Sequence, residues 1–171
     1  MQLQIVPIHE TQVQQLVCWR YAPPYEVYNL DPNSDEATSV YFLDPTNAYH
    51  AILDERGEMV GFCSFGTDGQ VPGGDYRADA LDIGMGMRPD LTGKGHGATF
   101  RDAVIAFALD NYAPTTLRVT IADFNQRAKR VWEKAGFEAV QCFRSEFSGL
   151  EFVVFVKRLR QERMFCFVAD G

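Results

Sequence analysis

The feature that most constrains this chain is a turn with glycines at alternate positions, Gly93, Gly95 and Gly97. Before it, residues 80–87 alternate between apolar and polar side chains, which predicts a strand. After it, residues 98–111 carry apolar side chains at helical spacing, which predicts a helix. Glycines let the backbone turn tightly and approach a ligand closely. Amides at a helix N-terminus favour an anion, so the turn predicts a site for a group such as pyrophosphate.

Three other interpretations of this turn remain open on these residues alone. Residues 93–98 formally match the dinucleotide-binding fingerprint, but residues 88–92 intervene after the strand and Asp123 comes later than the acidic residue that this fingerprint needs. A Walker A loop requires Ser or Thr after Gly-Lys, and glycine stands there instead. The third interpretation is a glycine-rich turn that binds no ligand.

A second motif follows one strand and one helix start further along the chain. It runs from Asn125 to Phe137 with the sequence NQRAKRVWEKAGF. With this motif present, the chain resembles the GNAT N-acetyltransferase superfamily. Members of that family carry Val-x-Pro-x-x-Arg-Gly-x-Gly-x-Gly at the end of the fourth strand and Asn-x-x-Ala-x-x-x-Tyr-x-x-x-Gly-Phe on the fourth helix. Both patterns occur here in that order and spacing, and the resemblance is sharp over residues 81–137.

The expected fold is α/β of the α+β type, the GNAT fold, in one domain over residues 1–171. Its sheet would be mixed, mostly antiparallel and twisted, with about seven strands and helices on both faces. The capping-box pattern over residues 11–14 predicts the start of the first helix, and residues 21–43 read as a loop with one short helix. The strand-like segments are residues 2–7, 48–53, 59–65, 80–87, 117–121, 137–147 and 150–159. Gly84 and Gly86 suggest a bulge in their strand or a close approach by another chain or ligand.

The resemblance implies acetyl-coenzyme A as cosubstrate. Met85 and Met87 would pair with the pantetheine arm like an added strand, and one amide there would polarise the thioester carbonyl. Asn125 would hydrogen-bond the pantetheine arm, and it also fits the N-cap of a helix. The residues expected to bind the pyrophosphate are Thr92, Gly93, Lys94, Gly95, His96 and Gly97.

Two residues depart from the family pattern. Thr92 stands where relatives usually carry Arg or Gln, so Lys94 or a protonated His96 would supply side-chain charge. Trp132 stands where many relatives carry the Tyr that protonates the departing thiolate. An indole cannot serve as that acid. We therefore expect Trp132 to pack against the cofactor or the core, and another residue or water to donate the proton.

Candidate catalytic and acceptor-binding residues lie outside the two motifs. Asp82 is the candidate general base, on the strand that carries the methionines; the alternative is an edge or capping role. Tyr21, Tyr25 and Tyr28 come before the second helical region, from which the family builds its acceptor pocket. They are assigned to substrate contact, with covering of the sheet as the alternative.

Composition and cysteine spacing exclude several other classes of protein. The formal net charge of −7 argues against a nucleic-acid surface, and no Cys or His spacing suggests a metal site. The N-terminal residues lack the basic and apolar regions of a secretory signal, and no apolar stretch spans a bilayer, so we expect a cytoplasmic protein without a membrane partner. The apolar segment Met164–Val168 predicts pairing into a homodimer.

Together these features predict an acetyl-CoA-dependent N-acetyltransferase that acts on a primary amine of a small molecule or of a peptide N-terminus. The amine would attack the thioester directly, without a metal or a covalent enzyme intermediate. A coenzyme A sensor or regulatory module of the same fold is the alternative, favoured by Trp132 and by the lack of an obvious Glu base. A nicotinamide-binding domain is a third alternative, against which the closing hairpin argues.

Overall fold

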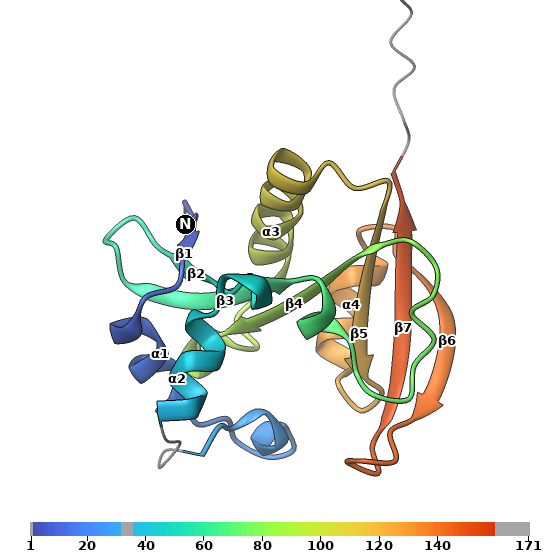
Figure 1. The fold of residues 1–171 in the computed structure, drawn as a ribbon, viewed down its shortest axis with the longest axis horizontal. Coiled ribbons are helices and arrows are strands. Elements are labelled where there is room, and N and C mark those ends of the chain that lie inside the picture. The colour runs from blue at the N-terminus through green and yellow to red at the C-terminus, as the bar shows by residue number, and fades with distance from the viewer. Residues whose placement is uncertain (1, 32–35, 160–171) are drawn as a thin grey trace, which may run out of the picture.

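A computed structural model describes residues 2–31 and 36–159 of the chain (Figure 1). Mixed strands and helices follow one another in a single series. In order they are β1 Gln4–Pro7, α1 Glu10–Val17, η1 Tyr25–Tyr28, α2 Glu36–Leu43, η2 Pro45–Asn47, β2 His50–Leu53, β3 Met59–Phe65, η3 Thr67–Gly69, β4 Leu81–Met87, η4 Pro89–Leu91, α3 Gly97–Tyr112, β5 Thr116–Ala122, α4 Gln126–Glu133, β6 Glu138–Arg144 and β7 Glu151–Arg158.

The strands form one seven-stranded sheet in the order β1-β2-β3-β4-β5-β7-β6. Every neighbouring pair is antiparallel except β4 with β5. This arrangement confirms the predicted mixed, mostly antiparallel sheet, including the hairpin of β2 with β3 and the closing hairpin of β6 with β7.

The parallel contact between β4 and β5 is unusually short. Only Leu81 with Leu117 and Asp82 with Arg118 are paired, although each strand has seven residues. Beyond these pairs the two strands run in different directions, as Figure 1 shows. The sheet therefore forks in its middle, at the end of β4 that leads into the glycine turn.

Two apolar clusters hold helices on opposite faces of the sheet. Helices α3 and α4 contribute Phe100, Val104 and Trp132 to the larger cluster. Helices α1 and α2 contribute Val13 and Phe42 to a second cluster. Burial of these side chains is the main force that attaches each helix to its face, at roughly 1.5–3 kcal/mol for each large apolar side chain. The expected helices on both faces are confirmed.

The glycines of β4 make room for side chains from β3. Register between the two strands is regular from Gly61–Met87 to Phe65–Ile83, so no bulge is present there. A Cβ on Gly86 would overlap the ring of Phe62, and a Cβ on Gly84 would overlap the hydroxyl of Ser64. The close approach suggested by the sequence is therefore made by these two side chains.

The predicted start of the first helix is wrong by two residues. Helix α1 begins at Glu10, and the side chain of Gln12 accepts a hydrogen bond from the backbone N–H of His9 at 2.9 Å. Thr11 thus already lies in the first turn and cannot cap it.

The segment Met164–Val168, on which the homodimer prediction rests, lies outside the described residues. Within residues 2–31 and 36–159, no helix is long and apolar enough to cross a membrane.

Candidate active site

A cavity of about 760 Å³ passes through the fork between β4 and β5. Residues from both faces of the sheet and from both strands of the fork line this cavity. They include Leu16 of α1, Phe42 of α2, Gly97 of α3, Val131 of α4, Met85 of β4 and Ile121 of β5. A ligand in this space can therefore reach from the glycine turn on one face to the layer of α1 and α2 on the other.

One edge of β4 faces this cavity. Arg88 donates its backbone N–H to Val60, and the Asp82 carbonyl accepts from Gly66, so even-numbered residues direct their backbone groups toward β3. Backbone groups alternate in direction along a strand, so those of Met85 and Met87 point toward β5. Because β5 pairs no further than Asp82, this edge is open to an added strand-like ligand.

The glycine turn has the backbone conformation that its sequence predicts. Gly93 and Gly95 adopt φ angles of +75° and +87°, which favour glycine because it lacks a Cβ. Gly97 opens α3, and a Cβ there would lie 2.7 Å from a methyl group of Val131. Of the residues predicted to bind the pyrophosphate, Lys94 does not line the cavity. The others do: Thr92, Gly93, Gly95, His96 and Gly97.

Positive charge near the turn comes from α4, which sequence reasoning missed. The Arg127 guanidinium lies 2.8 Å from the position of a Cβ on Gly93, and Arg130 and Lys134 also line the cavity. These three residues are spaced i, i+3 and i+7, so they share one helical face. That spacing is readable in the sequence and is the signal that would have identified them. They place positive charge beside the turn, where the sequence predicts it from Lys94 or His96.

The three candidate acceptor-binding tyrosines all line the cavity, but their hydroxyls bond to β4 and to the start of α4, on the side that the sequence predicts for the cofactor. Tyr21 donates to the Met87 carbonyl at 2.8 Å. Tyr28 accepts from Asn125 at 3.3 Å, and Tyr25 accepts from Arg127 at 2.8 Å. Burial, and then the nearby Tyr28, raise the pKa of Tyr21 to about 12, so its phenol stays a proton donor at neutral pH.

Asn125 and Trp132 have the local roles that their positions in α4 suggest. Asn125 caps the helix by accepting from the Ala128 backbone N–H at 3.1 Å. Trp132 is buried, with 3% of its surface exposed, and its ring lies edge-to-face against Phe137 at 4.9 Å between centroids. Trp132 thus packs in the core, one of the two alternatives expected for it, and it also lines the cavity.

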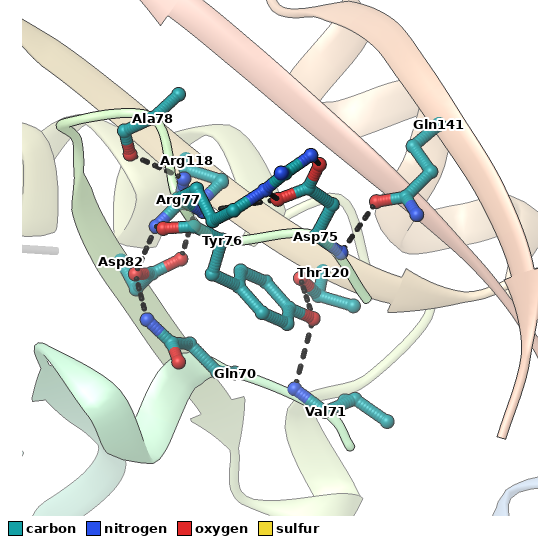
Figure 2. A network of polar contacts seen from close by, with 10 residues as sticks. All are labelled: Gln70, Val71, Asp75, Tyr76, Arg77, Ala78, Asp82, Arg118, Thr120 and Gln141. Carbon is teal, nitrogen blue, oxygen red and sulfur yellow. Dashed lines mark hydrogen bonds and ion pairs between the residues drawn. The ribbon is translucent and has the colours of Figure 1, made fainter. Parts of the chain in front are cut away.

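The predicted general base, Asp82, does not line the cavity. It is 2% exposed and forms two ion-pair contacts with Arg118, at 2.6 Å from Nε and 2.7 Å from Nη2 (Figure 2). Gln70 donates a further hydrogen bond to it at 2.8 Å. Both carboxylate oxygens are therefore engaged. This placement favours a role in holding β4 to β5 over the predicted role of proton acceptor.

The same network anchors the loop between β3 and β4. Figure 2 shows the Tyr76 phenol between Val71 and Thr120, with its oxygen 2.9 Å from the Val71 nitrogen and 3.0 Å from the Thr120 hydroxyl. The guanidinium of Arg118 lies over the Tyr76 ring at 4.9 Å. Val71 and Thr120 line the cavity, so the network positions one of its walls.

Comparison with known proteins agrees with this geometry. Residues 3–138 match the family model of the acetyltransferase (GNAT) domain. A match over most of the chain defines its class: the chain belongs to the GNAT acetyltransferase family, whose members use acetyl-coenzyme A. A comparison with curated protein sequences finds no match.

Solved structures show the same fold at low sequence identity. A chimera of the spermidine N-acetyltransferase SpeG from Vibrio cholerae and hSSAT is 15% identical, with a TM-score of 0.71 over 92% of this chain and 96% of that one. The structure of AAC(6')-Ib in complex with ribostamycin and coenzyme A is 17% identical, with a TM-score of 0.73 over 92% and 94% of the two chains. Among the described residues, no group of three or more His, Cys, Asp or Glu side chains is placed to hold a metal ion.

Proposed function

We propose that this protein transfers the acetyl group of acetyl-coenzyme A to a primary amine. The observation that carries the proposal is the open edge of β4, which leads directly into the glycine turn within one continuous cavity. Pantetheine can add to this edge as an extra strand, and the pyrophosphate can lie on the amides of residues 92–97 beside Arg127. Asn125, which lines the same cavity, would also contact the arm.

The chemistry needs only positioning and proton transfer. The nitrogen lone pair of the neutral amine attacks the thioester carbonyl carbon, a C–N bond forms, and the C–S bond breaks. A backbone N–H on the edge of β4, such as that of Met85, is directed to stabilise the oxyanion. The nitrogen loses a proton to a base or to water, coenzyme A leaves as a thiolate, and a thiol is a good enough leaving group for water to supply its proton.

Free-thiol release from acetyl-coenzyme A across a panel of amines tests this function. Turnover with one acceptor class supports the proposal and identifies the acceptor. Calorimetric titration with coenzyme A is the control, because it measures the cofactor site alone. Cofactor binding without turnover on any amine would instead support a sensor module. Burial of Trp132, in the position where relatives carry the acidic Tyr, is the observation that favours this second candidate.

A further inference from the structure

The charged groups that line the cavity are divided between its two ends. Among the described residues of the lining, the cations Arg101, Arg127, Arg130 and Lys134 all belong to α3 and the α4 region. The one carboxylate of that lining is Asp68, in the 3-10 turn after β3. It accepts a hydrogen bond from Tyr41 of α2 at 2.5 Å, so it lies on the opposite face of the sheet from the cations.

A buried hydroxyl accompanies this carboxylate. Ser64 also lines the cavity and is 1% exposed; its Oγ interacts with the Tyr49 phenol but makes no hydrogen bond of good geometry to the described residues. The Asp68 Oδ2 atom lies 3.9 Å from the position of a Cβ on Gly84, and the Ser64 hydroxyl lies 2.4 Å from the same position. A buried hydroxyl without a well-formed hydrogen bond costs free energy. A polar ligand atom beside Gly84 would remove that cost.

The position beside Gly84 is also adjacent to the reacting edge. Gly84 immediately precedes Met85, whose backbone faces the fork where the thioester is proposed to lie. An amine held between Ser64 and Asp68 would therefore lie next to the proposed acyl group. The carboxylate can hold the ammonium form and then accept its proton, which leaves the neutral amine as nucleophile.

The remaining wall of this end is aromatic. Trp19, Phe42, Tyr49 and Phe62 line it. Their rings contact one another, with centroids 4.5 Å apart for Phe42 and Tyr49 and 6.3 Å apart for Trp19 and Phe62. A body with several charges would lose its hydration here without compensation, because one carboxylate pairs with one ammonium.

We propose that Asp68 is the residue that binds and deprotonates the acceptor, with Ser64 positioning the amine, and that the acceptor is a compact monoamine with an apolar or aromatic body. This inference rests on the proposed acetyl transfer. In the step, the Asp68 carboxylate takes the ammonium proton, the neutral nitrogen bonds to the acyl carbon as the C–S bond breaks, and the second N–H proton passes to the departing thiolate of coenzyme A. Spermidine and aminoglycosides, which carry several ammonium groups, would be poor acceptors.

Steady-state thiol release with 2-phenylethylamine, spermidine and a peptide N-terminus tests the acceptor class. We expect kcat/KM to be at least tenfold higher for 2-phenylethylamine than for the other two acceptors. Asp68→Asn should lower kcat/KM about 100-fold or more, the usual contribution of a general base, while coenzyme A affinity measured by calorimetry stays unchanged. Asp79→Asn, an exposed carboxylate in the following loop, is the matched control and should retain activity.

Ser64→Ala separates positioning from structural support. Because the Ser64 hydroxyl forms no well-aligned hydrogen bond to the described residues, its removal should leave the melting temperature unchanged or raise it, while KM for the amine rises. Turnover that is insensitive to Asp68→Asn, or a preference for spermidine, would overturn this inference while the proposed acetyl transfer still stood.

If no amine is acetylated, the proposed function fails. Calorimetry with 2-phenylethylamine in the presence of coenzyme A then tests the pocket, and Asp68-independent binding or no binding would overturn it.

Discussion

Arg118 and Asp82 form a two-contact ion pair at the last position where β4 and β5 are paired. The pair is almost fully buried and lies directly before the fork. It closes the sheet on one side of that point, and on the other side the strands separate to form the cavity. The ion pair thus marks the point where the pairing of β4 with β5 ends and the cavity begins.

Removal of one partner of this pair should lower the free energy of unfolding. Asp82→Ala leaves a buried guanidinium without its carboxylate, so we expect a loss of about 3–5 kcal/mol in the free energy of unfolding, measured by urea denaturation. The double substitution Asp82→Leu with Arg118→Met should recover most of that loss, because apolar residues can replace a buried pair. If Asp82 holds the strands, acetyl transfer returns in the double variant. Restored stability with abolished transfer would instead identify Asp82 as the base.

A methyl group on Gly86 should disturb the contact between β3 and β4. Because its Cβ would overlap the Phe62 ring, Gly86→Ala is expected to destabilise the protein by about 1–3 kcal/mol, as overpacking does. Adding Phe62→Leu should recover part of the loss, and urea denaturation of the single and double variants measures this coupling. Strictly additive losses would show that Gly86 is needed for a reason other than the Phe62 ring.

Arg127→Gln should weaken coenzyme A binding without affecting the fold. The guanidinium lies beside Gly93, so its loss removes a charged contact to the proposed pyrophosphate, worth about 1.5–3 kcal/mol, or roughly 10–100-fold in Kd by calorimetry. The difference between wild type and variant should shrink as salt is added. Arg56→Gln, on the exposed turn between β2 and β3, is the matched control; equal effects of both substitutions would contradict the assignment.

His50 should make the protein less stable in mild acid. Its ring is half-buried, with the Phe107 centroid 4.8 Å away, and burial lowers the His50 pKa despite a hydrogen bond to the Ala48 carbonyl. Between the lowered pKa and about 6.5, the unfolded chain therefore binds more protons than the folded one. The free energy of unfolding should fall as the pH decreases through this window. Urea denaturation at pH 7.5 and 5.5 should show a smaller decrease for His50→Phe than for wild type; equal decreases would exclude His50.

Features that depend on a residue and its near neighbours were predictable from the sequence. The left-handed conformation of Gly93 and Gly95 follows from the missing Cβ, and Asn125 caps α4 through an amide three residues away. Strand and helix order follows from side-chain periodicity in the same way. The glycine-turn end of the cavity is built from such local elements, which is why its outline could be predicted.

Only the tertiary structure decided which side chains meet across the fork. Asp82 and Asp68 are both acidic residues near β4, and nothing in their local sequence distinguishes them. The pairing of β4 with β5 places Arg118 on Asp82, 36 residues away, whereas the turn after β3 places Asp68 in the cavity beside Tyr41. Contacts between segments distant in the chain depend on register and packing, which no short pattern encodes. The sequence alone therefore determined the glycine turn and the class of fold, and the packing of the sheet selected the carboxylate that lines the cavity.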